Sequence, residues 1–247
     1  MVIRFEGVNP RAEKWTSDRS SRLIVEITND TRELVRNTIL QGVQEGQGAD
    51  KIARDLVGRL NRATGKREGG LLGLTSLQAG YVGKARQQLL SGDPEQLREY
   101  LKRGRRDARF DRMVLKAIKT GKPLAKADVD KVTGRYADRL LQLRGDTIAR
   151  NEVLAALHAG QAEGMQQLID SGKVRADQIT KTWGATGDGR TRDSHMAMDK
   201  QSVAWGQPFV TPLGYKMQHP QDTSLGAPPS ETIQCRCFMQ VKVNYLA

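Results

Sequence analysis

The sequence predicts a mainly α-helical fold with a small α+β domain at its carboxy-terminal end. Three observations support this prediction. Apolar residues recur at helical spacing through most of the first 174 residues, five of the eight prolines follow residue 180, and short alternating segments appear after Val174. We therefore expect an elongated helical body over residues 1–174 and a compact, loop-rich α+β cap over residues 175–247.

The first part of the body is expected to form two helices. Apolar side chains between residues 15 and 46 recur at intervals of three, four and seven, which predicts one amphipathic helix of roughly 25 residues. A shorter helix follows Asp50, and the short link between the two predicts an antiparallel pair. Residues 61–73 are polar, glycine-rich and without periodicity, so we expect a loop or hinge there.

Three further helices are predicted in the middle of the chain. Thr75 and Gln78 have the spacing of a capping box, which would start a helix over residues 76–90. Asp93 and Pro94 would open a short helix. The basic segment 103–119 is expected to be a third helix, with a proline at 123 to stop it.

A proline-free stretch over residues 126–171 carries an apolar stripe at helical spacing. Four glycines weaken it, so the stretch predicts either one kinked helix or two helices in series. Gly172 is a candidate C-cap residue that would end this helix. In the cap we expect strands at 179–183, 209–211 and 238–243, a loop at 184–189 and a short helix within 192–200.

The balance of charge is strongly basic. The 40 Lys and Arg residues exceed the 28 Asp and Glu residues, which gives a net charge of +12, and this favours a polyanionic partner, nucleic acid first and an acidic protein surface second. Nine basic residues lie within 101–122. Six of these are predicted to face DNA or an acidic partner: Arg103, Arg105, Arg106, Arg109, Arg112 and Lys116. The alternative interpretation is a solvated helix face without a ligand.

Hydropathy predicts a soluble chain. Mean hydropathy is −0.57 and 5% of residues are aromatic, so the helical region should have a thin core that a partner supports. The first residues have no secretory-signal pattern, and no apolar run approaches the roughly 18–20 residues that cross a bilayer. We therefore expect no membrane contact and a cytoplasmic site of synthesis, where thiols stay reduced.

Cys235 and Cys237 are candidate metal ligands. If they lie on a strand, residues two apart project from one face, which suits two ligands of one ion. A disulfide between them is disfavoured, because their Cα atoms would lie roughly 6.5–7 Å apart. His195 and His219 are the candidates to complete a zinc site, with Asp222 a weaker one. The alternative interpretation is that both cysteines are reduced packing residues.

A dense ionic loop precedes the cysteines and contains Asp188, Arg190, Arg192, Asp193 and His195. As an active site, it would use His195 as a general base and the arginines as an anion clamp. Alternatively, Arg190 and Asp193 pin the loop to the helical body. The chain lacks a zinc-protease helix motif, a nucleophile elbow and a phosphate-binding loop, which argues against an enzyme.

These residues carry a family resemblance. Trp183, the run 186–195 (Thr-Gly-Asp-Gly-Arg-Thr-Arg-Asp-Ser-His), the loop 226–229 and the closing Ile-Gln-Cys-Arg-Cys at 233–237 resemble the phage Mu F-like minor head proteins, also called head morphogenesis proteins. Segments 69–75, 105–111 and 148–152 resemble the helical part of that family. Glycine often follows Asp199 in the family, and Lys200 stands there in this chain, so we expect a change in loop geometry.

The resemblance implies a structural protein without enzymatic activity. Its members are low-copy proteins of the procapsid, so the implied partners are the portal protein, packaged double-stranded DNA, and other copies of the chain or capsid and scaffold proteins. The implied location is the virion interior near the portal, reached from the host cytoplasm during assembly. Two alternatives remain: a metal-dependent nuclease or transferase in the carboxy-terminal domain, and a cytoplasmic DNA-binding protein, although no helix-turn-helix pattern is clear.

Overall fold

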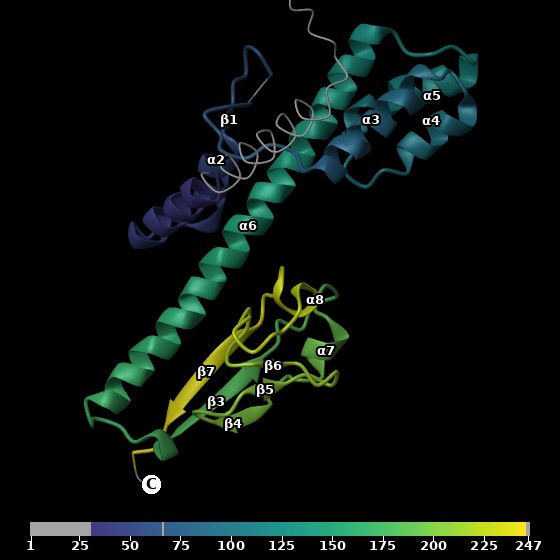
Figure 1. The fold of residues 1–247 in the computed structure, drawn as a ribbon. Coiled ribbons are helices and arrows are strands. Elements are labelled where there is room, and N and C mark those ends of the chain that lie inside the picture. The colour runs from purple at the N-terminus through teal and green to yellow at the C-terminus, as the bar shows by residue number, and fades with distance from the viewer. Residues whose placement is uncertain (1–30, 66, 246–247) are drawn as a thin grey trace, which may run out of the picture.

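The computed structural model describes residues 31–65 and 67–245, and its dominant element is one long helix. Helix α6 (Lys126–Asp170) has 45 residues, which corresponds to a length of about 67 Å. Helices gather around its amino-terminal half, and a small α+β unit lies beside its carboxy-terminal half (Figure 1). The predicted mainly α-helical fold with a small α+β part is confirmed.

Helix α6 is uninterrupted, which decides between the two arrangements that the sequence left open. The predicted role of Gly172 at the end of α6 is confirmed. Gly172 has φ of 69°, and its amide donates to the Ile169 carbonyl at 2.9 Å. A positive φ costs glycine little, so it can turn the chain away from the helix.

Three shorter helices pack on the first half of α6. They are α3 (Ser76–Leu90), α4 (Pro94–Leu101) and α5 (Asp111–Thr120). The capping box between Thr75 and Gln78 is confirmed, and the Asp93 side chain caps α4. Together with α6 they bury one apolar cluster: Ala85, Leu89, Leu97, Tyr100, Val114, Ala117, Leu124, Val129, Val132, Tyr136 and Leu140.

The prediction of one helix over 103–119 is wrong at its start. The chain turns after α4, forms the short 3-10 helix η1 (Ala108–Phe110) and only then enters α5. The side chain of Asp107 accepts a hydrogen bond from the Arg109 amide at 3.2 Å. Such a cap satisfies a free amide at a helix start, and it sets the beginning of η1.

A helical pair packs farther along α6. Residues 31–44 are helical, a short link follows, and α2 (Ala49–Val57) contributes Ile52, Ala53, Leu56 and Val57 to a second apolar cluster with α6. The other half of the predicted first helix, residues 15–30, lies outside the described residues. The predicted loop is partly ordered as a hairpin of β1 (Arg59–Leu60) and β2 (Arg67–Glu68).

The carboxy-terminal unit contains a three-stranded antiparallel sheet. Strand β3 (Ile179–Gly184) lies between β4 (Ser202–Ala204) and β7 (Phe238–Val243). Beside it are the hairpin β5 (Phe209–Val210) and β6 (Lys216–Met217), the short helices α7 (Asp193–Met196) and α8 (Pro229–Thr232), and the 3-10 helix η2 (Ala176–Gln178). The strands predicted at 179, 209 and 238 are confirmed, whereas β4, β6 and α8 were not predicted.

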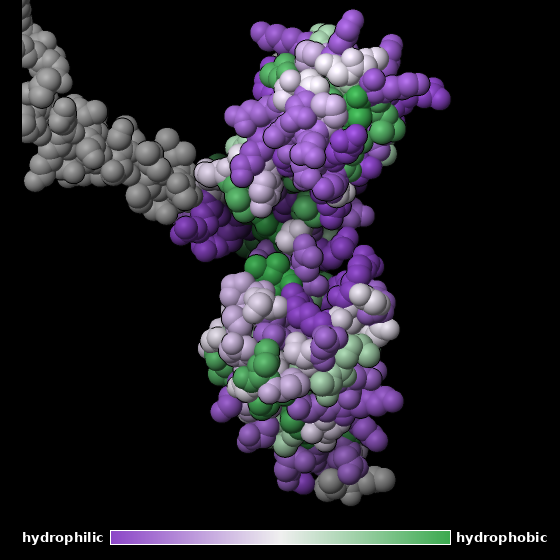
Figure 2. Space-filling model, turned by 90° about the vertical axis from the view of Figure 1, so that its right-hand side faces the viewer, coloured by the Kyte–Doolittle hydropathy of each residue, from purple (hydrophilic) through white to green (hydrophobic). Residues whose placement is uncertain are grey.

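Polar contacts join this unit to α6. Gln234 donates to Thr147 at 3.0 Å, and the Trp205 indole donates to Gln166 at 3.2 Å. Figure 2 shows two largely hydrophilic lobes joined by a narrower middle. None of the helices in the described ranges is long and apolar enough to span a membrane.

The crossing of α2 and α6 at Gly145 gives a prediction. A Cβ at Gly145 of α6 would lie 2.4 Å from Val57 Cγ1 of α2, whereas nothing lies within 4 Å of one at Gly160. Gly145→Ala should therefore lower the free energy of unfolding by about 1–3 kcal/mol through overpacking. Gly160→Ala is the matched control and should raise it by up to about 1 kcal/mol, because alanine favours the helix. Urea unfolding followed by circular dichroism measures both, and stabilisation by both variants would contradict this crossing.

Candidate functional site

His195, Cys235 and Cys237 converge in the interior of the carboxy-terminal unit. All three are buried, and their ligand atoms lie within 4.8 Å of one another. The Nδ1 atom of His195 is 3.4 Å from Cys235 Sγ and 3.5 Å from Cys237 Sγ. The structure therefore brings together three of the four side chains that the sequence predicted as metal ligands.

The spacing argument placed both cysteines on a strand, but they do not lie on one. They lie in the segment between α8 and β7, after Gln234, which has φ of 58°. Their thiols still face the same way, because both contact the ring of His195. His195 itself comes from α7, which follows the ionic loop.

His219 and Asp222 are outside this group. The Nδ1 atom of His219 is 2.9 Å from the Pro220 carbonyl oxygen, and its ring centroid lies 6.1 Å from that of His158. The Asp222 carboxylate accepts hydrogen bonds from the amides of Gln218 and Ser224. His158 of α6 is buried, and its Nδ1 lies 2.7 Å from Gln221 Oε1.

Glu231 belongs to the site and was not predicted. It is 4% exposed, and its Oε2 lies 3.0 Å from His195 Nε2 and accepts a hydrogen bond from Ser194 at 2.9 Å. The carboxylate is near enough for an ion pair but lies off the hydrogen-bond direction of the ring. No sequence signal marked Glu231, because its position beside His195 depends on how α7 and α8 pack.

Burial and hydrogen bonding separate the two thiols. The Cys235 thiol donates to Cys237, which lowers the Cys237 pKa to about 5, against the opposing effect of burial and with help from His195. The same hydrogen bond, together with burial, raises the Cys235 pKa well above its usual value. The pair therefore favours one thiolate, the form in which cysteine binds a metal.

The loop before α7 is tied down over the cysteines. Arg236, which lies between them, grips the Asp188 carboxylate with both terminal nitrogens, one of them at 2.6 Å from Oδ2. This contact lowers the Asp188 pKa. Arg192 donates to the Ile233 carbonyl oxygen, and Arg190 lies 3.6 Å from Asp188.

In the alternative interpretation Arg190 and Asp193 pin the loop to the helical body, but the ion pair of Arg190 is with Asp188 of the loop itself. Lys200 has φ of 65°, a backbone conformation that glycine adopts readily. Its amide donates to the Trp183 carbonyl at 2.8 Å. A residue other than glycine rarely adopts such a φ, so glycine would fit this turn with less strain.

The space above the cluster is too small for a substrate. Residues of the loop before α7 and of the cysteine segment enclose a cavity of about 10 Å³. This is room for about one water molecule. A cysteine with a histidine and a carboxylate could form a nucleophilic triad. Here, however, His195 is 1% exposed and Cys237 is 3% exposed, so the arrangement suits a small ion rather than a reacting substrate.

The six basic side chains predicted to face a polyanion divide into two groups. Arg103 donates two hydrogen bonds to Gln88, and Arg106 grips Asp111 with contacts of 3.0 and 2.9 Å. Arg109 contacts Asp107 at 2.6 Å. These three hold the fold together, whereas Arg105, Arg112 and Lys116 are exposed and form no ion pair within the described residues.

Asp107 explains part of this division. It is 1% exposed, and Arg135 and Arg139 approach it at 3.8 and 3.6 Å in addition to Arg109. The Arg109 hydrogen bond is the largest of the effects that lower its pKa to about 2. One buried carboxylate thus engages three arginines, which the net charge of the segment does not reveal.

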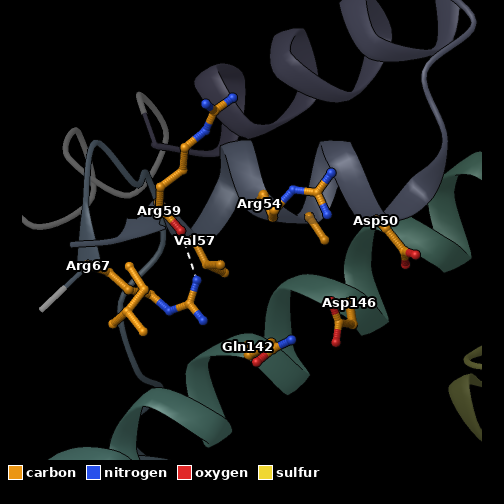
Figure 3. A pocket seen from close by; sticks show the side chains of 10 residues that line it. Asp50, Arg54, Val57, Arg59, Arg67, Gln142 and Asp146 are labelled. Carbon is orange, nitrogen blue, oxygen red and sulfur yellow. Dashed lines mark hydrogen bonds between the residues drawn. The ribbon is translucent and has the colours of Figure 1, made fainter. Parts of the chain in front are cut away.

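A larger cleft of about 660 Å³ lies between α2, the β1–β2 hairpin and α6. Figure 3 shows Arg54, Arg59 and Arg67 around it, with Asp50 and Asp146 on the same walls. Arg67 is held by Asp138 at 2.6 Å and by the Gly58 carbonyl at 2.8 Å. Because the carboxylates offset most of the positive charge, the cleft is not a strong anion site.

The ion pair of Asp188 with Arg236 forms a clamp over the cysteines, and breaking it should expose the loop before α7. Asp188→Asn and Arg236→Gln should each increase the rate of subtilisin cleavage within residues 184–192, and the double variant should be little worse than either single one, because both remove the same contact. Arg190→Gln is the matched control and should change little, since Arg190 is 78% exposed. Limited proteolysis with mass spectrometry measures this, and fully additive effects would show that the clamp does not form.

The family relationship follows from these elements. The model of the phage Mu protein F like protein family matches residues 96–240, which is more than half of the chain. No curated protein and no solved structure matches it. The matched range runs from α4 to β7 and includes α6, the clamped loop and both cysteines. The resemblance expected from the sequence is confirmed, and the chain belongs to the phage Mu protein F-like family of phage head proteins.

Proposed function

We propose that the protein is a minor head protein that binds the portal inside the capsid and contacts packaged double-stranded DNA. The observation that carries this proposal is the family match over residues 96–240, which includes parts of both the helical body and the cap. We place the boundary between these two domains at residues 174 and 175, and assign partner binding to the body. The proposed location is the virion interior, after assembly in the host cytoplasm.

Charge supports the DNA contact. The chain carries a net charge of +12, and the exposed side chains of Arg105, Arg112 and Lys116 lie around the start of α5. DNA phosphates attract such unpaired cations without regard to sequence. The proposal therefore rests on these three side chains and not on Arg103, Arg106 and Arg109, whose hydrogen bonds are used inside the fold.

Exposed apolar surface supports a protein partner. A groove of about 720 Å³ lies between the helix over 31–44, the middle of α6 and the loop 219–224. Its lining includes Val35, Ile39, Leu40 and Val43 of that helix, and Leu40 is 53% exposed. Leu34 of the same helix lies outside the lining and is 52% exposed. Apolar side chains in such numbers at a groove favour burial against another protein, and the family relationship makes the portal the proposed partner.

The proposal predicts DNA binding that is independent of sequence and sensitive to salt. The logarithm of the binding constant should fall with the logarithm of salt concentration by about 0.9 for each phosphate contact. Replacing Arg105, Arg112 and Lys116 together by glutamine should make this slope less steep by up to about 2.7. Fluorescence anisotropy with duplexes of unrelated sequence measures it.

A matched control removes the same charge elsewhere. The side chains of Lys173, Lys216 and Lys242 are exposed and lie after α6, in β6 and in β7, so their replacement by glutamine should change the slope much less. Equal slopes for the two triple variants would mean that only net charge matters. Failure of the wild-type protein to bind DNA at low salt would remove the DNA contact from the proposal.

The proposal also predicts a stable complex with the portal protein encoded by the same phage. Co-expression followed by size-exclusion chromatography should recover both proteins together, because the groove would be buried in the complex. Replacing Leu34 and Leu40 by serine should weaken that complex, whereas Leu115→Ser, which removes another 55% exposed leucine, should not. Phage particles made without the protein should lose infectivity, and normal infectious particles would contradict the assembly role.

A further inference from the structure

We propose that His195, Cys235 and Cys237 bind one zinc ion, with the fourth position open to a single water molecule. Tetrahedral zinc has Zn–S distances of about 2.3 Å and Zn–N distances of about 2.0–2.1 Å, so neighbouring nitrogen and sulfur ligands lie about 3.5 Å apart. The two distances from His195 Nδ1 to the sulfurs are 3.4 and 3.5 Å. The three side chains are therefore already spaced as ligands of one ion.

The surroundings of His195 match those of a metal-bound histidine. Its Nδ1 faces the sulfurs, while its other ring nitrogen lies 3.0 Å from Glu231, and Ser194 holds that carboxylate with a hydrogen bond. Histidine ligands usually direct the second ring nitrogen to a carboxylate, which fixes the ring orientation and increases its basicity. A small rotation of Glu231 would align this hydrogen bond.

Trp183 supplies a further contact of this kind. Its ring packs edge-on to His195 with centroids 5.2 Å apart. The indole N–H is buried and has no hydrogen-bond partner among the described residues. A donor directed at a metal-bound sulfur would be satisfied by the charge on that sulfur.

The donor set selects the ion. Two thiolates with one imidazole suit zinc and exclude magnesium and calcium, which prefer oxygen ligands. The cavity beside the cluster holds about one water molecule, which fits a fourth ligand but not a substrate. The clamp between Asp188 and Arg236 closes the site from outside, so the ion would stabilise the fold of the cap.

Metal analysis of the full-length protein tests this inference. Protein purified without chelator from zinc-supplemented cells should contain about one zinc per chain. Titration of the metal-free protein with Co²⁺ should give the sulfur-to-cobalt charge-transfer bands and the intense visible bands of a tetrahedral site. Cys235→Ser, Cys237→Ser and His195→Gln should each abolish these bands, and Glu231→Gln should keep them while weakening zinc binding about 10- to 100-fold.

His219→Gln is the matched control, because it removes the other histidine of the cap and should leave one zinc per chain. Loss of the ion in His219→Gln with retention in His195→Gln would overturn the assignment. If the ligand variants fail to fold, the titration of the wild-type protein still decides the question. A wild-type protein that carries no zinc and gives no cobalt bands would leave Cys235 and Cys237 as packing residues and overturn the inference.

Discussion

The whole fold depends on one constraint, the continuity of α6 over 45 residues. Its first half supplies Val129, Val132 and Tyr136 to one apolar cluster, and Ala149 belongs to the next cluster, with α2. Its second half meets the cap through side-chain hydrogen bonds. Among the described residues, α3, α4 and α5 contribute to the first cluster and α2 to the second, so α6 is the element that joins the two. The exposed glycines of α6 are tolerated because this packing outweighs their low helix propensity.

The cap is held together differently from the helical body. Its buried apolar set is small and centres on Trp183, Met198, Phe209 and Met217, and many of its buried side chains are polar. Lys181, for example, is 3% exposed and its ammonium group donates to Gln218 through two contacts of 2.8 and 2.7 Å. Burial lowers the Lys181 pKa to about 8. Such a core needs specific partners for each polar group, which is why a bound ion would contribute much to its stability.

The sequence predicted what depends on local chemistry. The capping box at Thr75, the strand starting at Phe238 and the cap at Gly172 follow from neighbouring residues. The cysteine pair and His195 were predicted by residue type, but His219 was wrongly grouped with them, since spacing cannot show which of two histidines a fold brings near. Glu231, the partner of His195, and Arg236, the partner of Asp188, come from segments far apart in the chain, and only tertiary packing pairs them. The same applies to the buried Asp107. It pairs with Arg109, which the net charge of the segment had led us to assign to DNA or an acidic partner.

In the proposed division of stability, apolar packing on α6 orders the helical body, and the cluster of His195, Cys235 and Cys237 orders the cap. Hydrogen exchange of the full-length protein before and after treatment with a zinc chelator tests this division most directly. The amides of β3 and β7 should lose protection while those of the first half of α6 keep theirs. Unchanged protection in β3 and β7, or an equal loss in α6, would contradict this division.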